Sequence, residues 1–174
     1  RPQRRSRQVA DWVLSKASAR GGADFEMLDL ADYDLPLLDE PTPPSMGNYI
    51  QPHTKVWADA VSKFDGFIFV TAEYNHSVPG ALKNALDYLY AEWNNKAAGF
   101  VSYGSAGGVR AVENLRLITA ELQMAGVRAQ VALPFAAEFE NFTAFTPSAS
   151  AEEALEPLLE QLISWSTALA TTRP

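Results

Sequence analysis

The 174-residue chain contains 47% hydrophobic and 20% charged residues, a composition typical of one folded domain of ordinary size. Its formal net charge of −7 argues against a general binder of nucleic acid or anionic membranes. The absence of cysteine excludes disulfides, thiolate metal sites and a thiol nucleophile, and no apolar stretch approaches the ~20 residues of a membrane span. We therefore expect a single domain over residues 1–174, with a cytoplasmic location as the simplest interpretation.

Four arginines gather at the start of this otherwise acidic chain, namely Arg1, Arg4, Arg5 and Arg7. They lead into a predicted helix that ends at Gly21-Gly22 and whose inward face carries Val9, Trp12, Val13 and Ala17. The cluster fits a solvated basic end. It also fits a phosphate site, where guanidinium groups and the N–H groups at a helix N-terminus hold the anion.

Residues 23–65 are predicted to form a strand, a long loop and a helix. Ala23–Leu30 reads as the strand, and His53–Asp65 as a helix whose inward residues are Val56, Trp57, Ala60 and Val61. The loop at 32–52 is rich in proline but too apolar for a simple linker. We expect it to be a flap near the ligand or a contact between subunits, and the alternative is an inert surface loop.

The central stretch is Phe67–Tyr90, which begins as an apolar run typical of a strand buried on both faces. The polar residues Glu73, Tyr74, Asn75, His76 and Ser77 follow at the end of this strand. Pro79 suits the first position of a helix, with Ser77 or a neighbour as the cap. The core-facing stripe of that helix consists of Leu82, Ala85, Leu86 and Leu89.

A second block of the same kind runs from Ala97 to Gly126. Ala97–Val101 is a predicted strand, and Ser102–Gly108 is a loop of small residues that opens a helix. The inward face of this helix carries Val112, Leu115, Ile118 and Leu122, and Gly126 is its expected stop. Val127–Phe135 is the last predicted strand, and a final helix either begins at Pro157 or is kinked there.

Strands that alternate with helices predict a parallel sheet with helices on both faces. In such folds ligands bind where the carboxyl ends of the strands meet. The loops Arg1–Arg7, Ala72–Ser77 and Ser102–Gly108 each follow a predicted strand position, so we expect them to converge on one site.

The run AEYNHSVPGALKNALDYL resembles the signature of the NADPH-dependent FMN reductase family of flavodoxin-like proteins, which includes quinone, azo-dye and chromate reductases. It departs from the usual form at Ala72, where the family has proline. The resemblance implies a flavodoxin-like, doubly wound parallel sheet of five strands in the order 2-1-3-4-5. Because the first strand of this order is interior, we expect it to lie upstream of residue 1, in residues that the printed sequence lacks.

The resemblance also implies a bound FMN, with NAD(P)H as co-substrate. The residues that contact the FMN phosphate in the family correspond to Arg1, Arg4 and Ser6. Its ring contacts correspond to Glu73, Tyr74, Asn75 and His76 in one loop and to Ser102, Tyr103, Gly104, Ser105, Gly107 and Gly108 in the other. No side chain is expected to be catalytic, because hydride passes through FMN N5, and no metal is expected. His76 reads better as a structural residue than as a general base.

The implied function is an NAD(P)H oxidoreductase that reduces a small acceptor, such as a quinone, an azo compound, a flavin or a metal oxyanion. Similar proteins assemble as homodimers or as homotetramers built from two dimers, with the helix after Pro79 at the interface. Two alternatives remain, a flavodoxin-type electron carrier and a non-enzymatic FMN-binding or scaffold protein. Direct reduction by NADPH separates the enzyme from the carrier, and the absence of flavin affinity would favour the scaffold.

Overall fold

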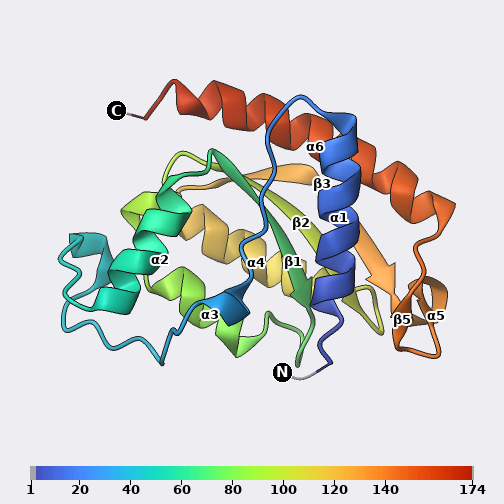
Figure 1. The fold of residues 1–174 in the computed structure, drawn as a ribbon, viewed down its shortest axis with the longest axis horizontal. Coiled ribbons are helices and arrows are strands. Elements are labelled where there is room, and N and C mark those ends of the chain that lie inside the picture. Colours follow the sequence, from blue (N-terminus) through green and yellow to red (C-terminus); the bar gives the residue numbers. More distant parts are fainter. Residues whose placement is uncertain (1–2, 174) are drawn as a thin grey trace.

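Three parallel strands form the centre of the computed structural model, which describes residues 3–173 (Figure 1). They are β1 (Gly66–Ala72), β2 (Ala97–Gly104) and β3 (Ala125–Pro134), paired in the order β1-β2-β3. Every residue of β2 is buried, because this strand has a neighbour at each edge and helices over both faces. The three strands predicted from these segments are confirmed, with small changes at their ends.

Helices cover both faces of the sheet, which confirms the predicted α/β layering (Figure 1). One face packs against α2 (Pro52–Ser62), α3 (Gly80–Asp87) and α4 (Val109–Glu121). The other packs against α1 (Ser6–Arg20) and α6 (Ala149–Ala170). No helix in the range 3–173 is long and apolar enough to cross a membrane.

Short elements fill the connections between these layers. They are η1 (Leu30–Asp32), η2 (Pro44–Met46), η3 (Ala91–Trp93), α5 (Phe135–Glu138), and the antiparallel pair β4 (Phe139–Glu140) and β5 (Ala144–Phe145). The structure therefore has a three-stranded parallel sheet and a separate two-stranded one, and the predicted five-strand order is not observed.

The predicted strand Ala23–Leu30 is wrong. Residues 22–29 belong to no helix or strand, and Leu30 begins η1. A strand needs a neighbour to receive its backbone hydrogen bonds. No described backbone group pairs with residues 22–28.

Other differences concern the ends and faces of helices. Pro79 is the N-cap of α3 rather than its first residue, and Ser77 does not cap it. Gly126 lies in β3, because the chain leaves α4 earlier, through Gln123 at φ 56°. Val56 is 59% exposed instead of facing the core. Pro157 lies inside α6, whose N-cap is Ser148.

The loop at 32–52 is held against the domain by side chains from α3 and from the residues that follow this helix. The backbone oxygen of Pro36 accepts hydrogen bonds from Asn84 Nδ2 at 2.7 Å and from the Tyr88 hydroxyl at 3.0 Å. Asn84 Oδ1 in turn accepts from the Leu38 N–H at 3.0 Å. The Tyr49 hydroxyl donates to Glu92 at 2.9 Å. These contacts show an anchored loop and leave both predicted roles open.

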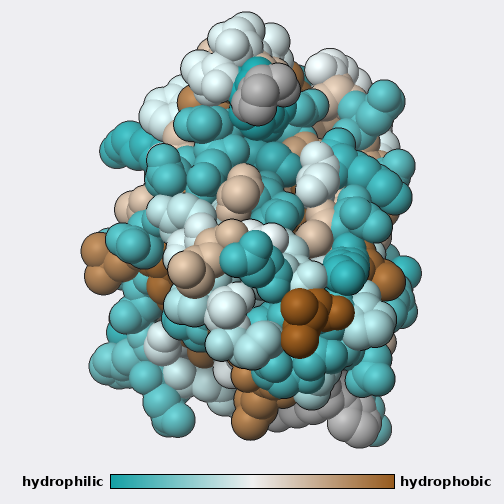
Figure 2. Space-filling model, turned by 90° about the vertical axis from the view of Figure 1, so that its left-hand side faces the viewer, coloured by the Kyte–Doolittle hydropathy of each residue, from teal (hydrophilic) through white to brown (hydrophobic). Residues whose placement is uncertain are grey.

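Exposed apolar side chains on this loop are scattered. Leu37, Met46 and Ile50 are 86%, 62% and 60% exposed. Figure 2 views the molecule from the side where this loop and α2 lie, and brown residues there are separated by teal ones. Singly exposed apolar residues are ordinary on protein surfaces, so this face carries no sign of a docking site.

Trp57 is the residue whose replacement should best report the packing of α2 against the sheet. Its ring is 2% exposed and its Nε1 donates to the Ala85 carbonyl at 2.8 Å. Trp57→Phe removes the donor and leaves a void, so we expect the free energy of unfolding to fall by about 2 kcal/mol. Urea denaturation measures this. The neighbouring exposed change Val56→Ala should stay within about 0.5 kcal/mol, and an equal effect of the two would contradict the packing described.

Candidate functional site

A cavity of about 1360 Å³ lies along β1, and its lining includes the carboxyl end of this strand and the start of α1. Several predicted residues line it, namely Arg4, Ser6, Glu73, Tyr74, Tyr103 and Gly104. The others, Asn75, His76, Ser102, Ser105, Gly107 and Gly108, are not among its lining residues. Arg1 lies outside the described residues. The three predicted loops do converge, but only part of each reaches the cavity.

The turn after β1 is tight and has a defined geometry. Tyr74 and Ser77 exchange two backbone hydrogen bonds of 3.0 Å, with Asn75 at φ 50° and His76 at φ 66° between them. Two consecutive left-handed residues are the mark of a type I′ turn, and Asn and His tolerate this conformation better than most residues. Asn75 and His76 are thereby presented at an exposed tip, while Glu73 points back into the structure.

Glu73 joins the turn to the N-terminus of α4. Its side chain is 6% exposed and forms an ion pair with Arg110. It also accepts hydrogen bonds from the backbone N–H groups of Arg110 at 3.1 Å and Ala111 at 3.4 Å. Burial raises the pKa of the Glu73 carboxyl, but the hydrogen bonds from Arg110 and Ala111 outweigh it and hold that pKa below its ordinary value. Glu73 is thus an ionised link between two loops.

Arg110 also fixes His76. Its Nη1 lies 2.7 Å from His76 Nε2, and since a guanidinium can only donate, the imidazole accepts through Nε2. Asn114 adds a hydrogen bond of 2.8 Å to the His76 carbonyl. Neither Arg110 nor Asn114 was predicted from the sequence. A signal existed for the first, because a cation in the first turn of a helix opposes the helix dipole and needs an acidic partner.

The small-residue loop is shorter than predicted, because Ser102, Tyr103 and Gly104 belong to β2. The buried Ser102 hydroxyl donates to the Gly107 carbonyl at 2.7 Å and so closes the loop from inside. Gly108 has φ 75°, and a Cβ there would lie 2.7 Å from the Ser102 Cβ. Only glycine fits at this position.

The exposed part of this loop offers hydrogen-bond donors. Ser105 and Ala106 are exposed, and no described residue accepts a hydrogen bond from their backbone N–H groups. The Tyr103 ring is 6% exposed and packs on Phe135 and Phe139, with ring centroids 6.0 and 5.9 Å away. A ligand would therefore meet mainly backbone groups here.

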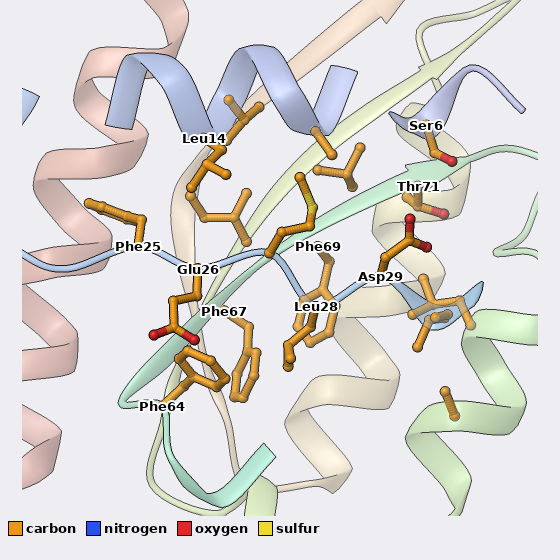
Figure 3. Close-up of a pocket in the computed structure, with 18 of the residues that line it drawn as sticks. Ser6, Leu14, Phe25, Glu26, Leu28, Asp29, Phe64, Phe67, Phe69 and Thr71 are labelled. Atoms are coloured by element: carbon orange, nitrogen blue, oxygen red, sulfur yellow. The ribbon is translucent and has the colours of Figure 1, made fainter. Parts of the chain in front are cut away.

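The start of α1 is the electropositive end of the site. Arg5 is its N-cap and makes no side-chain capping bond, so the first N–H groups of the helix have no capping side chain. Arg4 and Arg7 both form ion pairs with Asp29, which the sequence analysis had placed in a strand and overlooked. Figure 3 shows Ser6, Asp29 and Thr71 at the same end of the cavity.

This arrangement can hold an anion and a flat polar ring. The uncapped helix N-terminus and Arg4 supply charge and donors at one end of the cavity. The N–H groups of Ser105 and Ala106 follow Gly104, which lines the cavity, and supply donors beside it. Within residues 3–173 there is no group of three or more His, Asp or Glu residues that could hold a metal ion.

Replacing Glu73 tests the link between the loops. Glu73→Gln keeps the shape but loses the charge, so we expect the free energy of unfolding to fall by about 1–3 kcal/mol at pH 7. The folded-state pKa lies below the unfolded one, so the stabilisation is present above the unfolded pKa and disappears as the pH falls through the folded pKa. The loss should therefore shrink below about pH 4.

The matched control is Asp87→Asn, which removes the same charge from an exposed pair with Lys83 on α3. It should change stability by less than about 0.5 kcal/mol. Urea denaturation of both variants from pH 3 to pH 8 gives the comparison. A Glu73→Gln loss that does not change with pH would show that the carboxylate charge is not what joins the loops.

A sequence model described as NADPH-dependent FMN reductase matches residues 1–138. The chain is 43% identical over 118 residues to an NAD(P)H-dependent FMN reductase of Schizosaccharomyces pombe, an alignment that covers 67% of the chain and 59% of that protein. It is 37% identical over 163 residues to an NAD(P)H-dependent FMN reductase of a Nectria species, covering 88% and 80%.

Among solved structures, the flavoenzyme NAD(P)H:(acceptor) oxidoreductase FerB from Paracoccus denitrificans superposes with a TM-score of 0.73 at 20% identity. The alignment covers 97% of this chain and 92% of that one. At this identity the likeness shows a shared fold.

Proposed function

We propose, from the premise that this chain belongs to the NADPH-dependent FMN reductase family, that it acts in reducing a small acceptor with NAD(P)H through a bound FMN. The aligned part of the chain spans about three-fifths of the length of its fission-yeast relative, so the activity of the whole protein is stated here as a proposal. FMN, when bound, supplies the hydride-accepting and hydride-donating chemistry. The chain supplies the binding site.

The observation that carries this proposal is the convergence of three polar chain segments at one end of the sheet. The start of α1, the end of β1 and the end of β2 all line the same cavity. Ligands of open α/β sheets bind at this end of the strands. A site built mainly from backbone N–H groups suits a flavin, whose ring edge carries several hydrogen-bond acceptors.

The residues at the start of α1 suit the phosphate of FMN. Arg4 and the first N–H groups of the helix provide donors, and the Ser6 side chain lies at the same end of the cavity as Asp29 and Thr71 (Figure 3). Arg1 is assigned to the same role by family resemblance. Asp29 brings a negative charge to this end, and we assign it the role of orienting Arg4 and Arg7. Asp11 also pairs with Arg7, so the three positive charges of Arg4, Arg5 and Arg7 face two carboxylates and still exceed them.

The remaining predicted contacts divide into binding and positioning roles. Tyr74 and Gly104, which line the cavity, are proposed to meet the ring. The N–H groups of Ser105 and of its unpredicted neighbour Ala106 lie outside that lining and are proposed to reach the ring edge from the adjoining loop. Glu73 holds the two ring loops at a fixed separation through Arg110. Asn75, Ser102, Gly107 and Gly108 shape these loops, and His76 is restrained by Arg110. No side chain is assigned a proton-transfer role.

Residues 1–174 are proposed to form one flavodoxin-like domain whose complete sheet has the order 2-1-3-4-5. The protein is also proposed to be cytoplasmic and to assemble as a homodimer or as a dimer of dimers, on the grounds of composition and family resemblance. The acceptor is a small molecule of the quinone, azo, flavin or metal-oxyanion class. The acidic net charge of −7 favours one alternative, an electron carrier that docks on protein partners.

Anaerobic mixing of the FMN-loaded protein with NADPH separates these functions. We expect the visible flavin absorbance to bleach and to return when a quinone is added. A flavin that binds but stays oxidised would favour the carrier. Failure to bind FMN in equilibrium dialysis would contradict the site itself.

Removal of a single positive charge tests whether the start of α1 binds the phosphate of FMN. Arg4→Gln removes one charge-assisted contact, so we expect the Kd for FMN to rise about tenfold, equivalent to about 1.4 kcal/mol. Riboflavin, which lacks the phosphate, should bind the variant and the parent alike. The control Arg128→Gln removes the same charge from an exposed position in β3 and should leave the Kd unchanged. Equal losses for FMN and riboflavin would show that Arg4 does not contact the phosphate.

A further inference from the structure

Arg5 carries a positive charge that no described carboxylate neutralises. At the start of α1, Arg4 and Arg7 form ion pairs with carboxylates, whereas Arg5 forms none within residues 3–173. Its Nε instead donates to the Phe142 carbonyl at 3.4 Å, and its Nη1 donates to the Gln3 carbonyl at 3.0 Å. A guanidinium that is bonded only to neutral oxygens keeps its full charge for an anion.

Phe142 lies at the tip of the β4–β5 hairpin in a conformation that is unusual for an aromatic residue. The Thr143 N–H donates to the Glu140 carbonyl at 3.0 Å. The two residues between them, Asn141 and Phe142, have φ 51° and φ 56°. Turns of this kind prefer glycine at the second position, because a bulky side chain is strained there. Phe142 is nevertheless 66% exposed, so core packing does not explain it, and strained residues gather at functional sites.

The hairpin is held against α1, which sets the position of Phe142 relative to Arg5. Gln8 of α1 donates through Nε2 to the Thr143 carbonyl at 3.3 Å and accepts through Oε1 from the Phe145 N–H at 2.8 Å. Figure 1 shows β5 near the N-terminal end of α1. These contacts join two segments that are far apart in the sequence into one surface.

This surface adjoins the candidate flavin site. Pro134, the last residue of β3, pairs in register with Gly104, and the next residue, Phe135, lines the cavity. Arg5 lines the same cavity. The Phe142 ring lies outside that lining and packs edge-on against Phe135, with 6.3 Å between the ring centroids. We call the surface formed by Arg5 and Phe142 the hairpin subsite.

The two side chains together specify a ligand that is both flat and anionic. An exposed aromatic face binds planar rings by stacking, and a guanidinium binds phosphate through paired, charge-assisted hydrogen bonds. A quinone offers a ring without the anion, and a metal oxyanion offers the anion without a ring. A purine nucleotide with a phosphate on its ribose offers both. NADPH carries such a group, adenosine 2′-phosphate, at the end remote from its nicotinamide.

We propose that the hairpin subsite binds the adenosine 2′-phosphate end of NADPH, with the adenine stacked on Phe142 and the 2′-phosphate paired with Arg5. The inference rests on the proposed function, in which NAD(P)H reaches the flavin at the same end of the sheet. NADH lacks the 2′-phosphate, so Arg5 is the residue that favours NADPH over NADH. Arg4 and Ser6 keep their role at the phosphate of FMN, so the two phosphates are held by different arginines.

The role of Arg5 is tested with two nucleotides that differ only in the 2′-phosphate, adenosine 2′,5′-bisphosphate and adenosine 5′-monophosphate. Isothermal titration calorimetry measures both with FMN-saturated protein, because the phosphate of FMN then occupies its own site. We expect the bisphosphate to bind about tenfold more tightly than the monophosphate, and Arg5→Gln to remove this difference. The control Arg128→Gln, at an exposed position in β3, should preserve it.

Replacement of Phe142 separates a binding role from a packing role. Phe142→Gly removes the ring and relieves the strain of the positive φ. We therefore expect both nucleotides to bind about tenfold more weakly, while the melting temperature stays the same or rises. Phe142→Tyr keeps the aromatic face and should retain both affinities. A melting temperature that falls by more than about 4 °C in Phe142→Gly would show that the ring supports the fold instead, and would overturn the stacking role.

The pattern of results distinguishes this inference from the proposed function. A protein that holds FMN and is reduced by NADPH, yet binds the two nucleotides equally or not at all, would overturn the hairpin subsite and leave the reductase intact. A protein that holds no FMN fails the earlier dialysis test, and the inference fails with it. In turnover, the ratio of kcat/KM for NADPH to that for NADH should fall about tenfold in Arg5→Gln. An unchanged ratio would contradict the role of Arg5.

Discussion

The pairing of backbone edges is the constraint on which the rest of this structure depends. A parallel strand covered by helices on both faces has no water to receive its N–H and C=O groups, so each edge needs a neighbouring strand. β2 meets this condition fully and is buried throughout. β1 meets it on one side only, and the consequences spread to the cavity beside it, to the unpaired segment 22–29 and to the start of α1.

At the carboxyl end of the sheet, the shape of the candidate site is set mainly by the backbone conformation of its loops. A few side chains hold these loops together. The turn at Asn75-His76 and the glycines of the 104–108 loop set the shape. Glu73 then connects the two loops by an ion pair with Arg110 and bonds to the N-terminus of α4. A rigid cradle of this kind fits a cofactor that brings its own reactive atoms, because the protein's task is orientation. The loop at 32–52 is separately anchored to α3, and none of its residues lines the cavity.

Two networks were invisible in the sequence because their members are far apart along the chain. Arg4 pairs with Asp29 across the whole of α1, and Glu73 meets Arg110 across α3 and β2. Charged residues of either sign are common on any surface, so sequence gives no reason to match these pairs in particular. Only the folded chain brings the members of each pair together, in the case of Glu73 and Arg110 at the carboxyl ends of the paired strands β1 and β2.

The sequence by itself determined the α/β layering, the three observed strands, the helices between them and the family to which the chain belongs. These follow from local patterns, namely apolar runs, helical spacing and the contiguous EYNHSVPG motif, all of which act over a few residues. Only the tertiary structure decided that 23–30 forms no strand, that Tyr103 belongs to the core, and that Glu73 and His76 both contact Arg110. The physical reason is that strand pairing, burial and ion pairing are properties of neighbours in space, and the identity of those neighbours is fixed by the fold as a whole.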